Sequence, residues 1–384
     1  MSGPLTGITV VELSGIGPVP FAGMVLSDLG ANVVRIDRPQ PMPYADGLGG
    51  DPTGRSKRSI ALDLKHPEGL EVARRLAAGC DILVEGLRPG VAERLGLGPE
   101  PCLRANPALV YGRMTGWGQD GPLAYSAGHD LNYLALTGVL GAIGPRAHPV
   151  PPLNLIGDYG GGALFLVVGV LGALLHARVT GVGQVVDAAI IDGVGLLAAI
   201  VRGGLAAGNW VEQRQANLLD GGAPFYRTYR TADGGHVAVG ALEPRFFASL
   251  LDGLEIDPAS VPAQYDRSGW HEVELRLATK FATADRQHWE SVFAGTDACV
   301  TPVLSWNEAL DHPHTQARAA FTHVEGVMHP APAPRFSVTT ARTPGPGPAP
   351  GSDTVALLAE LGYSEAEIGK LRRIGAAFGS SVEE

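Results

Sequence analysis

The sequence predicts an α/β domain built on a parallel sheet, followed by a smaller α+β domain. Through the first half, short apolar strand patterns alternate with helix patterns of about 10 to 15 residues, which is typical of parallel strands joined by helices. In residues 218–242, alternating aromatic and β-branched residues with Asp-Gly turns predict antiparallel hairpins. Of the 384 residues, 45% are hydrophobic and 18% are charged, so a sizeable core is available.

Strands of the first half are expected where apolar and β-branched residues run together: 8–13, 32–37, 59–64, 81–86 and 109–116. Helices are expected between them at 21–30, 67–79 and 89–95. The helix at 67–79 has the clearest ends, because Pro67 suits a first turn and Gly79 suits the position after the last turn. This order favours right-handed crossovers on a parallel sheet.

Longer helices are expected next, at 130–143 and 161–176, followed by one more strand at 183–190. The longest apolar run, 163–175, is shorter than the roughly 20 residues of a membrane span, so it predicts a fully buried helix and no membrane partner. The N-terminus shows no secretory signal pattern. We therefore expect a soluble protein of the cytoplasm.

The second half suggests an inserted domain. After the hairpins, helices are expected to about residue 320, and a Pro/Gly-rich extended segment leads to a final helix that returns to the first domain. The expected boundaries are a large domain at 1–200 completed by 335–384, a linker at 201–220, a small α+β domain at 221–320 and a return linker at 321–350.

Charge and cysteine content exclude several classes of partner. A net charge of −10 argues against binding to nucleic acid or to an anionic membrane. Cys80, Cys102 and Cys299 are too few and too dispersed for a disulfide framework or a zinc site, so each is expected to be a small buried side chain. No metal is expected.

A partial dinucleotide motif follows the first strand. Gly15 and Gly17 precede a helix, and the next strand ends at Asp37, but Pro20 stands where the fingerprint needs a third glycine or alanine. A tight strand-to-helix turn is the favoured interpretation, and a nicotinamide-dependent dehydrogenase is a minor alternative. Arg38, at the carboxyl end of a strand, is placed to hold a ribose phosphate.

Four titratable residues stand at the starts of expected helices. His129 and Asp130 follow a glycine, Asp158 precedes a triple glycine, and Glu243 precedes a proline. One interpretation is that the acids cap helices and that the histidine belongs to a loop. The other is a proton-transfer site, provided that the fold brings these side chains together.

Motifs along nearly the whole chain resemble the class III CoA-transferase (CaiB/BaiF) superfamily. RPGVAERLGLG and GQVVDAAIIDG are typical of the superfamily as a whole. GHD and GDYGGG, followed by LEPRF, resemble its α-methylacyl-CoA racemase branch more specifically. The resemblance implies a Rossmann-like parallel-sheet large domain with a smaller α+β domain, in an obligate interlocked homodimer whose active site lies between the large domain of one subunit and the small domain of its partner.

The resemblance also implies an activity in branched-chain fatty acid and lipid metabolism. The expected reaction interconverts the (2R) and (2S) forms of 2-methylacyl-CoA by proton transfer through an enolate, with CoA as part of the substrate and no separate cofactor. His129 and Asp158 resemble the two catalytic bases, on opposite faces of the α-carbon, and Glu243 resembles the residue that orients the histidine. Backbone N–H groups near Gly157 and Tyr159 are expected to meet the enolate oxygen.

Asp130 keeps an alternative open. In the transferases of this superfamily, the aspartate at this position takes the acyl group as a mixed anhydride, and those enzymes generally lack the preceding histidine. This chain has both residues. A class III CoA-transferase moving CoA between carboxylic acids is therefore the second candidate, and a non-catalytic acyl-CoA binder is a third.

The resemblance further implies a CoA site. Arg38 and Arg94 are expected at the CoA phosphates. The residues expected along the nucleotide and pantetheine path are Ile16, Leu62, Gly86, Leu87, Val91 and Leu95. Weaker candidates, equally consistent with solvated surface, are Arg55, Lys57, Arg58 and Arg88.

Overall fold

The computed structural model describes residues 3–40 and 52–379. By its internal contacts the chain divides into two units. The first comprises Met1–Thr137, Leu153–Leu197 and Ala319–Glu384, and the second comprises Gly138–Pro152 and Ala198–Arg318. The segment Gly138–Pro152 thus groups with the second unit, whereas the sequence-based boundaries put it in the large domain.

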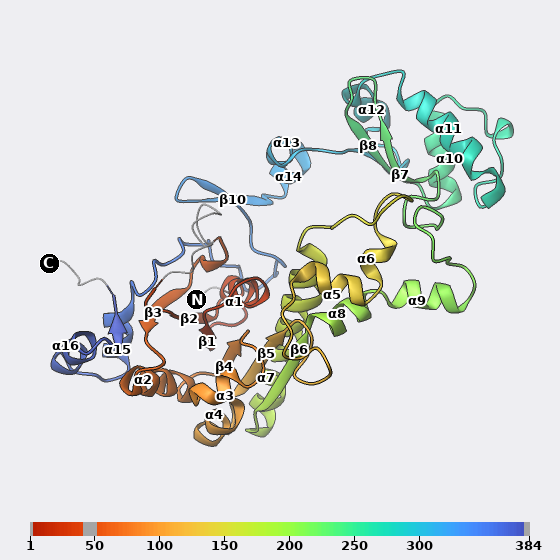
Figure 1. Ribbon diagram of the computed structural model, residues 1–384. Helices are drawn as coiled ribbons and strands as arrows, with labels where there is room; N and C mark the ends of the chain where they lie inside the picture. Colours follow the sequence, from red (N-terminus) through yellow and green to blue (C-terminus); the bar gives the residue numbers. More distant parts are fainter. Residues whose placement is uncertain (1–2, 41–51, 380–384) are drawn as a thin grey trace. The chain divides into compact units, whose positions relative to one another are not determined.

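The first unit contains a seven-stranded sheet in the order β12-β3-β2-β1-β4-β5-β6 (Figure 1). Six strands form the parallel part that the sequence predicts: β1 Thr9–Leu13, β2 Asn32–Asp37, β3 Arg58–Leu62, β4 Ile82–Glu85, β5 Val110–Thr115 and β6 Gln184–Ala189. The short strand β12, Ala377–Phe378, pairs antiparallel with β3. The C-terminal segment therefore completes the edge of the sheet.

Helices cover both faces of this sheet. Those of the first unit are α1 Pro18–Asp28, α2 Pro67–Ala78, α3 Val91–Leu95, α4 Pro99–Ala105, α5 Asp130–Leu136, α7 Leu164–Thr180, α8 Ile190–Leu197, α15 Thr354–Glu360 and α16 Glu365–Arg373. On one face, Val72 of α2, Leu357 of α15 and Ile368 of α16 share a core with strand residues such as Val11 and Leu83. On the other face, α1 packs on β1, β2 and β4, and α7 packs on β5 and β6.

Two expected helices differ in detail from the structure. The helix expected at 130–143 is two helices, α5 and α6 (Val139–Ala142), because Gly138 between them has a left-handed φ of 83°. The helix expected at 161–176 begins earlier, as a π-helical segment over Leu155–Ala163 that runs directly into α7.

The prediction that this apolar helix is fully buried is wrong. Helix α7 packs one side on β5 and β6, and its other side leaves Val168, Leu175 and Val179 exposed by 68%, 71% and 86%. The helical stretch Leu155–Thr180 is long and apolar enough to cross a membrane, and 44% of its most apolar window is buried. Core helices of soluble proteins share that length and composition, so these features alone assign no membrane.

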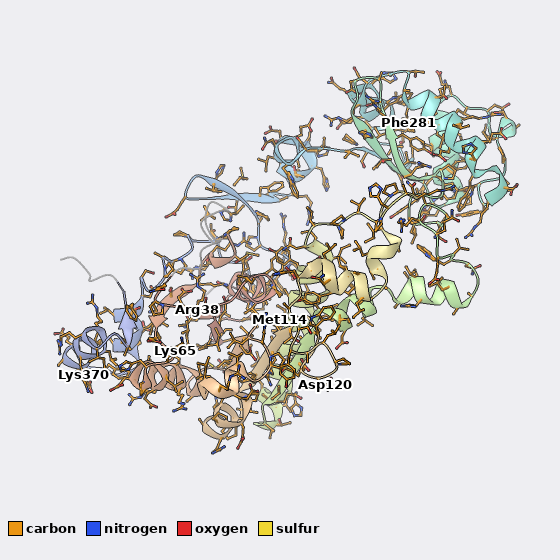
Figure 2. All side chains as sticks on the ribbon, in the orientation of Figure 1. Arg38, Lys65, Met114, Asp120, Phe281 and Lys370 are labelled. Carbon is orange, nitrogen blue, oxygen red and sulfur yellow. The ribbon has the colours of Figure 1, made fainter. Side chains whose placement is uncertain are left out.

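The second unit carries the predicted hairpin. Strands β7 Tyr226–Arg230 and β8 His236–Gly240 pair antiparallel, and β9 Val300–Pro302 adds a third strand. Its core includes Phe225, Leu250 and Phe281, and Figure 2 labels Phe281. Its helices are α6, α9 Ala199–Ala206, α10 Pro244–Gly253, α11 Trp270–Phe281, α12 Arg286–Phe293, α13 Trp306–Asp311 and α14 Pro313–Ala317.

Two further expectations are corrected. Part of the segment expected as an extended linker, 321–350, forms a hairpin of β10 Phe321–Val324 and β11 Val327–Pro330, because Glu325 and Gly326 both adopt positive φ and make a tight turn. Cys299, expected to be buried, is exposed, whereas Cys80 and Cys102 are buried. All three cysteines are free.

Candidate active site

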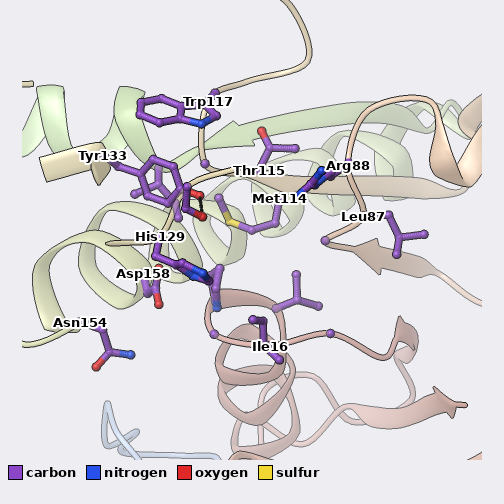
Figure 3. Close-up of a pocket in the computed structure, with 18 of the residues that line it drawn as sticks. Ile16, Leu87, Arg88, Met114, Thr115, Trp117, His129, Tyr133, Asn154 and Asp158 are labelled. Atoms are coloured by element: carbon purple, nitrogen blue, oxygen red, sulfur yellow. Dashed lines mark hydrogen bonds between the residues drawn. The ribbon is translucent and has the colours of Figure 1, made fainter. Parts of the chain in front are cut away.

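The first unit contains a pocket of about 640 Å³ at the carboxyl edge of its parallel sheet (Figure 3). The strand order reverses between β1 and β4, and loops that follow these two strands, Gly15–Pro20 and Gly86–Pro89, line the pocket. Open α/β sheets bind ligands at such reversals, outside the carboxyl ends of the strands. The fold therefore places a ligand site where the sequence patterns put the chemistry-bearing residues.

The pocket brings together residues that lie far apart in the sequence. His129 and Asp158, the two expected bases, both line it. The other expected site residues on its wall are Ile16, Gly86, Leu87, Arg88 and Tyr159. This convergence is what the sequence patterns alone could not establish.

Asp158 is held in a setting that favours its protonated form. It lies in the first turn of the π-helix and is partly buried. Burial, together with the negative charge of Asp130, raises the pKa of Asp158 to about 6, although a hydrogen bond from Asn154 and the nearby His129 act in the opposite direction. A carboxyl group with a pKa close to neutrality is suited to both accepting and donating a proton.

His129 stands at the N-terminal boundary of α5 with an exposed side chain. Its backbone N–H donates to Oδ1 of Asn132 at 3.0 Å, which anchors the loop at the start of α5. His129 is also one of the residues that line the pocket. The adjoining wall is aromatic. The Tyr133 hydroxyl donates to the carbonyl of Gly128, and the Tyr133 ring packs edge-on to Trp117 at 4.7 Å.

Asp130 points away from the pocket wall and toward the π-helix. Its Oδ1 accepts the Asp158 N–H at 2.6 Å, and the carboxylate also receives a hydrogen bond from the Gly157 backbone. A Cβ on Gly157 would lie only 2.2 Å from that Oδ1, so only glycine permits the contact. Burial raises the pKa of Asp130.

This arrangement corrects the expected enolate-binding groups. The Gly157 and Asp158 N–H groups donate to Asp130, and the Tyr159 N–H donates to the carbonyl of Asn154 at 3.3 Å. Because these donors already have acceptors, they are not free to meet an enolate oxygen. Tyr159 contributes instead through its ring, which stacks on Phe21 of α1 at 4.2 Å.

The loop after β1 is a tight turn and not a dinucleotide cradle. Gly17 has a φ of 69°, and a Cβ there would lie 3.0 Å from Oδ2 of Asp158. Asp37, which would hold a ribose in a dinucleotide site, is buried and accepts hydrogen bonds from Arg35 and Ser59. The dehydrogenase alternative therefore has no support in this structure.

Several expected CoA residues lie outside the pocket wall. Arg38 and Arg94 are exposed on the same unit (Figure 2 labels Arg38), and Val91 and Leu95 are half-buried on α3. Leu62 is 1% exposed and belongs to the core. Its side chain cannot line a ligand path.

Two weaker CoA candidates are internal. Arg55 pairs with Asp28, and Nζ of Lys57 lies 2.7 Å from Oε2 of Glu12 and donates to the carbonyl of Pro20. Both cations are buried, so they are neither solvated surface nor available to a ligand. Arg58, the third weak candidate, pairs with Glu360 at the surface.

Glu243 lies in the second unit, at the start of α10, with an exposed side chain. Among residues 3–40 and 52–379, no group of three or more histidine, cysteine or acidic side chains is arranged to hold a metal ion. The sequence reasoning missed Met114, Trp117, Tyr133 and Asn154 on the pocket wall. The position of Met114 and Trp117 at the carboxyl end of a predicted strand was the signal that could have found them.

Comparison with known proteins identifies the family of the chain. The profile of CoA-transferase family III matches residues 5–354. The chain is 46% identical to the mouse α-methylacyl-CoA racemase, covering 95% of each protein, and 45% identical to the human one, covering 96% of each. A crystal structure of a CaiB/BaiF family protein from Brucella suis superposes with a TM-score of 0.80 at 24% identity, over 94% of this chain and all of that one, and so shares the fold. The chain belongs to CoA-transferase family III.

Proposed function

We propose that this protein is an α-methylacyl-CoA racemase, which interconverts the (2R) and (2S) forms of 2-methylacyl-CoA thioesters. The observation that carries the proposal is the presence of His129 and Asp158 on one pocket wall. Full-length similarity to two proteins named α-methylacyl-CoA racemase supports the same reaction.

The chemistry needs one group to remove the α-proton and a second to return a proton to the opposite face. A neutral imidazole and a carboxylic acid together hold the single proton required, and the two groups exchange roles for the other enantiomer. His129 and Asp158 are that pair. The raised pKa of Asp158, about 6, keeps a share of this carboxyl protonated near neutral pH. No separate cofactor enters, because two side chains complete the proton transfer.

The CoA part of the substrate would enter along the wall formed by Ile16, Leu87 and Arg88. Arg38 and Arg94 are exposed and therefore available to the CoA phosphates. Glu243 would orient His129 by accepting a hydrogen bond from one ring nitrogen. In an interlocked dimer, the second unit of the partner subunit would supply this carboxylate.

The exposed apolar side of α7 supports a homodimer. Val168, Leu175 and Val179 project from one side of a helix whose other side is packed on the sheet. Apolar side chains exposed along one side of a helix are characteristic of a protein interface. The free cysteines fit a reducing compartment, so we place the enzyme in the cytoplasm.

The transferase alternative requires Asp130 to attack an acyl-CoA. In this structure its carboxylate is buried and accepts hydrogen bonds from the backbone of Gly157 and Asp158. A nucleophile engaged in this way is poorly placed to reach a thioester. Asp130 is better explained as a residue that positions Asp158 and raises its pKa.

The two functions are separated by one assay. The protein is incubated with a single epimer of a 2-methylacyl-CoA in D₂O, without any acceptor acid. A racemase equilibrates the epimers and incorporates deuterium at the α-carbon. If neither occurs, and a second incubation with an added free acid transfers CoA to that acid, the transferase is correct and the racemase proposal fails.

A further inference from the structure

A buried charged network ties the CoA-side loop of the pocket to the sheet. Glu85, the last residue of β4, is the register partner of Arg113 on β5, and Nε of Arg113 donates to Oε1 of Glu85 at 3.1 Å. The Nη2 of the same guanidinium lies 2.9 Å from Oε1 of Glu93 in α3. Glu85 and Arg113 are both buried. One side chain therefore joins two strands and a helix.

The network reaches the pocket wall through a single backbone group. The second oxygen of Glu85, Oε2, accepts the Leu87 N–H at 2.7 Å, and Leu87 and Arg88 line the pocket. On its other side, the loop presses against α1, since a Cβ on Gly86 would lie 2.8 Å from Cγ2 of Val19. The loop is thus held between α1 and the carboxylate of Glu85.

A buried ion pair of this kind is weak evidence for stability, because an apolar pair of similar volume often stabilises a fold as well or better. The ion pair fixes geometry, since both oxygens of Glu85 accept hydrogen bonds, from Arg113 Nε and from the Leu87 N–H, while Nη2 of Arg113 has only the ion-pair contact with Glu93. In this protein the ion pair of Glu85 and Arg113 fixes the segment 86–95, which carries Arg88 and Arg94.

We propose that Glu85 and Arg113 are positioning residues for the CoA moiety, and that the segment 86–95 holds acyl-CoA tightly only while Glu85 is ionised. The proposal rests on the proposed function in one respect, that this segment binds CoA. Neither residue is a base in the reaction, so their effect falls on substrate binding and not on the chemical step.

The ionisation of Glu85 occurs in the physiological range. Burial raises the pKa of Glu85 to about 7, opposed by the hydrogen bond from Leu87 and by Arg113, while Glu93 adds to the rise. The other titratable groups facing the network are Tyr111 of β5 and Asp187 of β6, the register partner of Arg113. Below a pH of about 7 the proton on Glu85 weakens its contacts with Arg113 and Leu87. The KM for acyl-CoA should therefore rise as the pH falls through this value.

The test is Glu85→Gln, which keeps the shape and an acceptor for the Leu87 N–H but removes the charge. Its KM for a 2-methylacyl-CoA at high pH should rise about tenfold, with kcat close to that of the wild type. Between about pH 8 and pH 6 its KM should rise less than that of the wild type, because only the wild type loses the charge of Glu85 in this range. Glu93→Gln, at the exposed end of the network, should raise KM about two- to threefold. Glu100→Gln, which breaks the exposed pair with Arg104 on α4, is the matched control and should change nothing.

Binding of free CoA, measured by calorimetry over the same pH range, separates this inference from the proposed function because it needs no turnover. If the affinity for CoA depends on Glu85 but the protein does not racemise its substrate, the proposed function is wrong and the inference about Glu85 stands. The inference is overturned if Glu85→Gln and Glu93→Gln both have the KM of the wild type. It is also overturned if kcat falls in these variants while KM is unchanged. If Glu85→Gln does not fold, a pH-independent wild-type KM or an unaltered Glu93→Gln overturns it equally.

Discussion

Burial first, and then the negative charge of Asp130, raise the pKa of Asp158. Asp130 accepts the Asp158 N–H and adds negative charge beside the Asp158 carboxyl group. Asn154 donates a hydrogen bond to that carboxyl group, which lowers its pKa. The sequence patterns identified His129, Asp130 and Asp158 as candidates. They could not assign Asp130 its place, because a cap, a nucleophile and a positioning carboxylate have the same sequence signature until their partners are known.

Replacing Asp130 by asparagine tests this arrangement. The amide oxygen can still accept the Asp158 N–H, but the negative charge that raises the pKa of Asp158 is lost. The pKa of Asp158 should therefore fall below about 6, and the acidic limb of the pH profile for α-proton exchange should move to lower pH. An unmoved limb would contradict the role assigned to Asp130, and so would an acyl-enzyme found on Asp130 in the wild type.

At the scale of the elements, the strands were the most predictable part and the π-helix the least. Buried parallel strands are continuous apolar runs, so β1, β2 and β4 lie within about two residues of their expected positions. The π-helical turn leaves no such period in the sequence. Its glycines mark close packing, since a Cβ on Gly161 would lie 2.6 Å from Val194 of α8.

The packing of the π-helix predicts contrasting effects for two glycines. Gly157→Ala places a methyl group against Oδ1 of Asp130 and should destabilise the protein by about 1 to 3 kcal/mol and lower activity at least tenfold. Gly203→Ala, in the middle of α9 with nothing within 4 Å of its Cβ position, should be neutral or slightly stabilising. Thermal unfolding and racemase turnover of both variants measure this. Equal effects would contradict the packing argument.

At the scale of the whole molecule, the expected site residues are divided between the two units. Ile16, His129 and Asp158 belong to the first unit, whereas Glu243 belongs to the second. No local pattern in a sequence reports which units assemble into one site. The family resemblance supplied the expectation of an interlocked dimer, which composition and periodicity could not reach.

The proposed homodimer can be tested by substitutions on the exposed side of α7. The double substitution Leu175→Asp and Val179→Asp places charges on the proposed interface, and the dimer fraction measured by light scattering should fall sharply. Val338→Asp, at an apolar side chain exposed by 90% elsewhere on the first unit, is the control and should leave the mass unchanged. A monomeric wild type, or a fully dimeric double variant, would refute the assignment of this surface.

The central claim is that His129 and Asp158 act on opposite faces of the same α-carbon, and exchange of each pure epimer in D₂O tests it most directly. In His129→Ala and in Asp158→Ala, epimerisation should fall by a factor of about 10² to 10⁴, while CoA still binds. Each variant should nevertheless exchange the α-proton of one epimer without inverting it, and the two variants should prefer opposite epimers. Full epimerisation in either variant, or exchange of the same epimer by both, would contradict the two-base account.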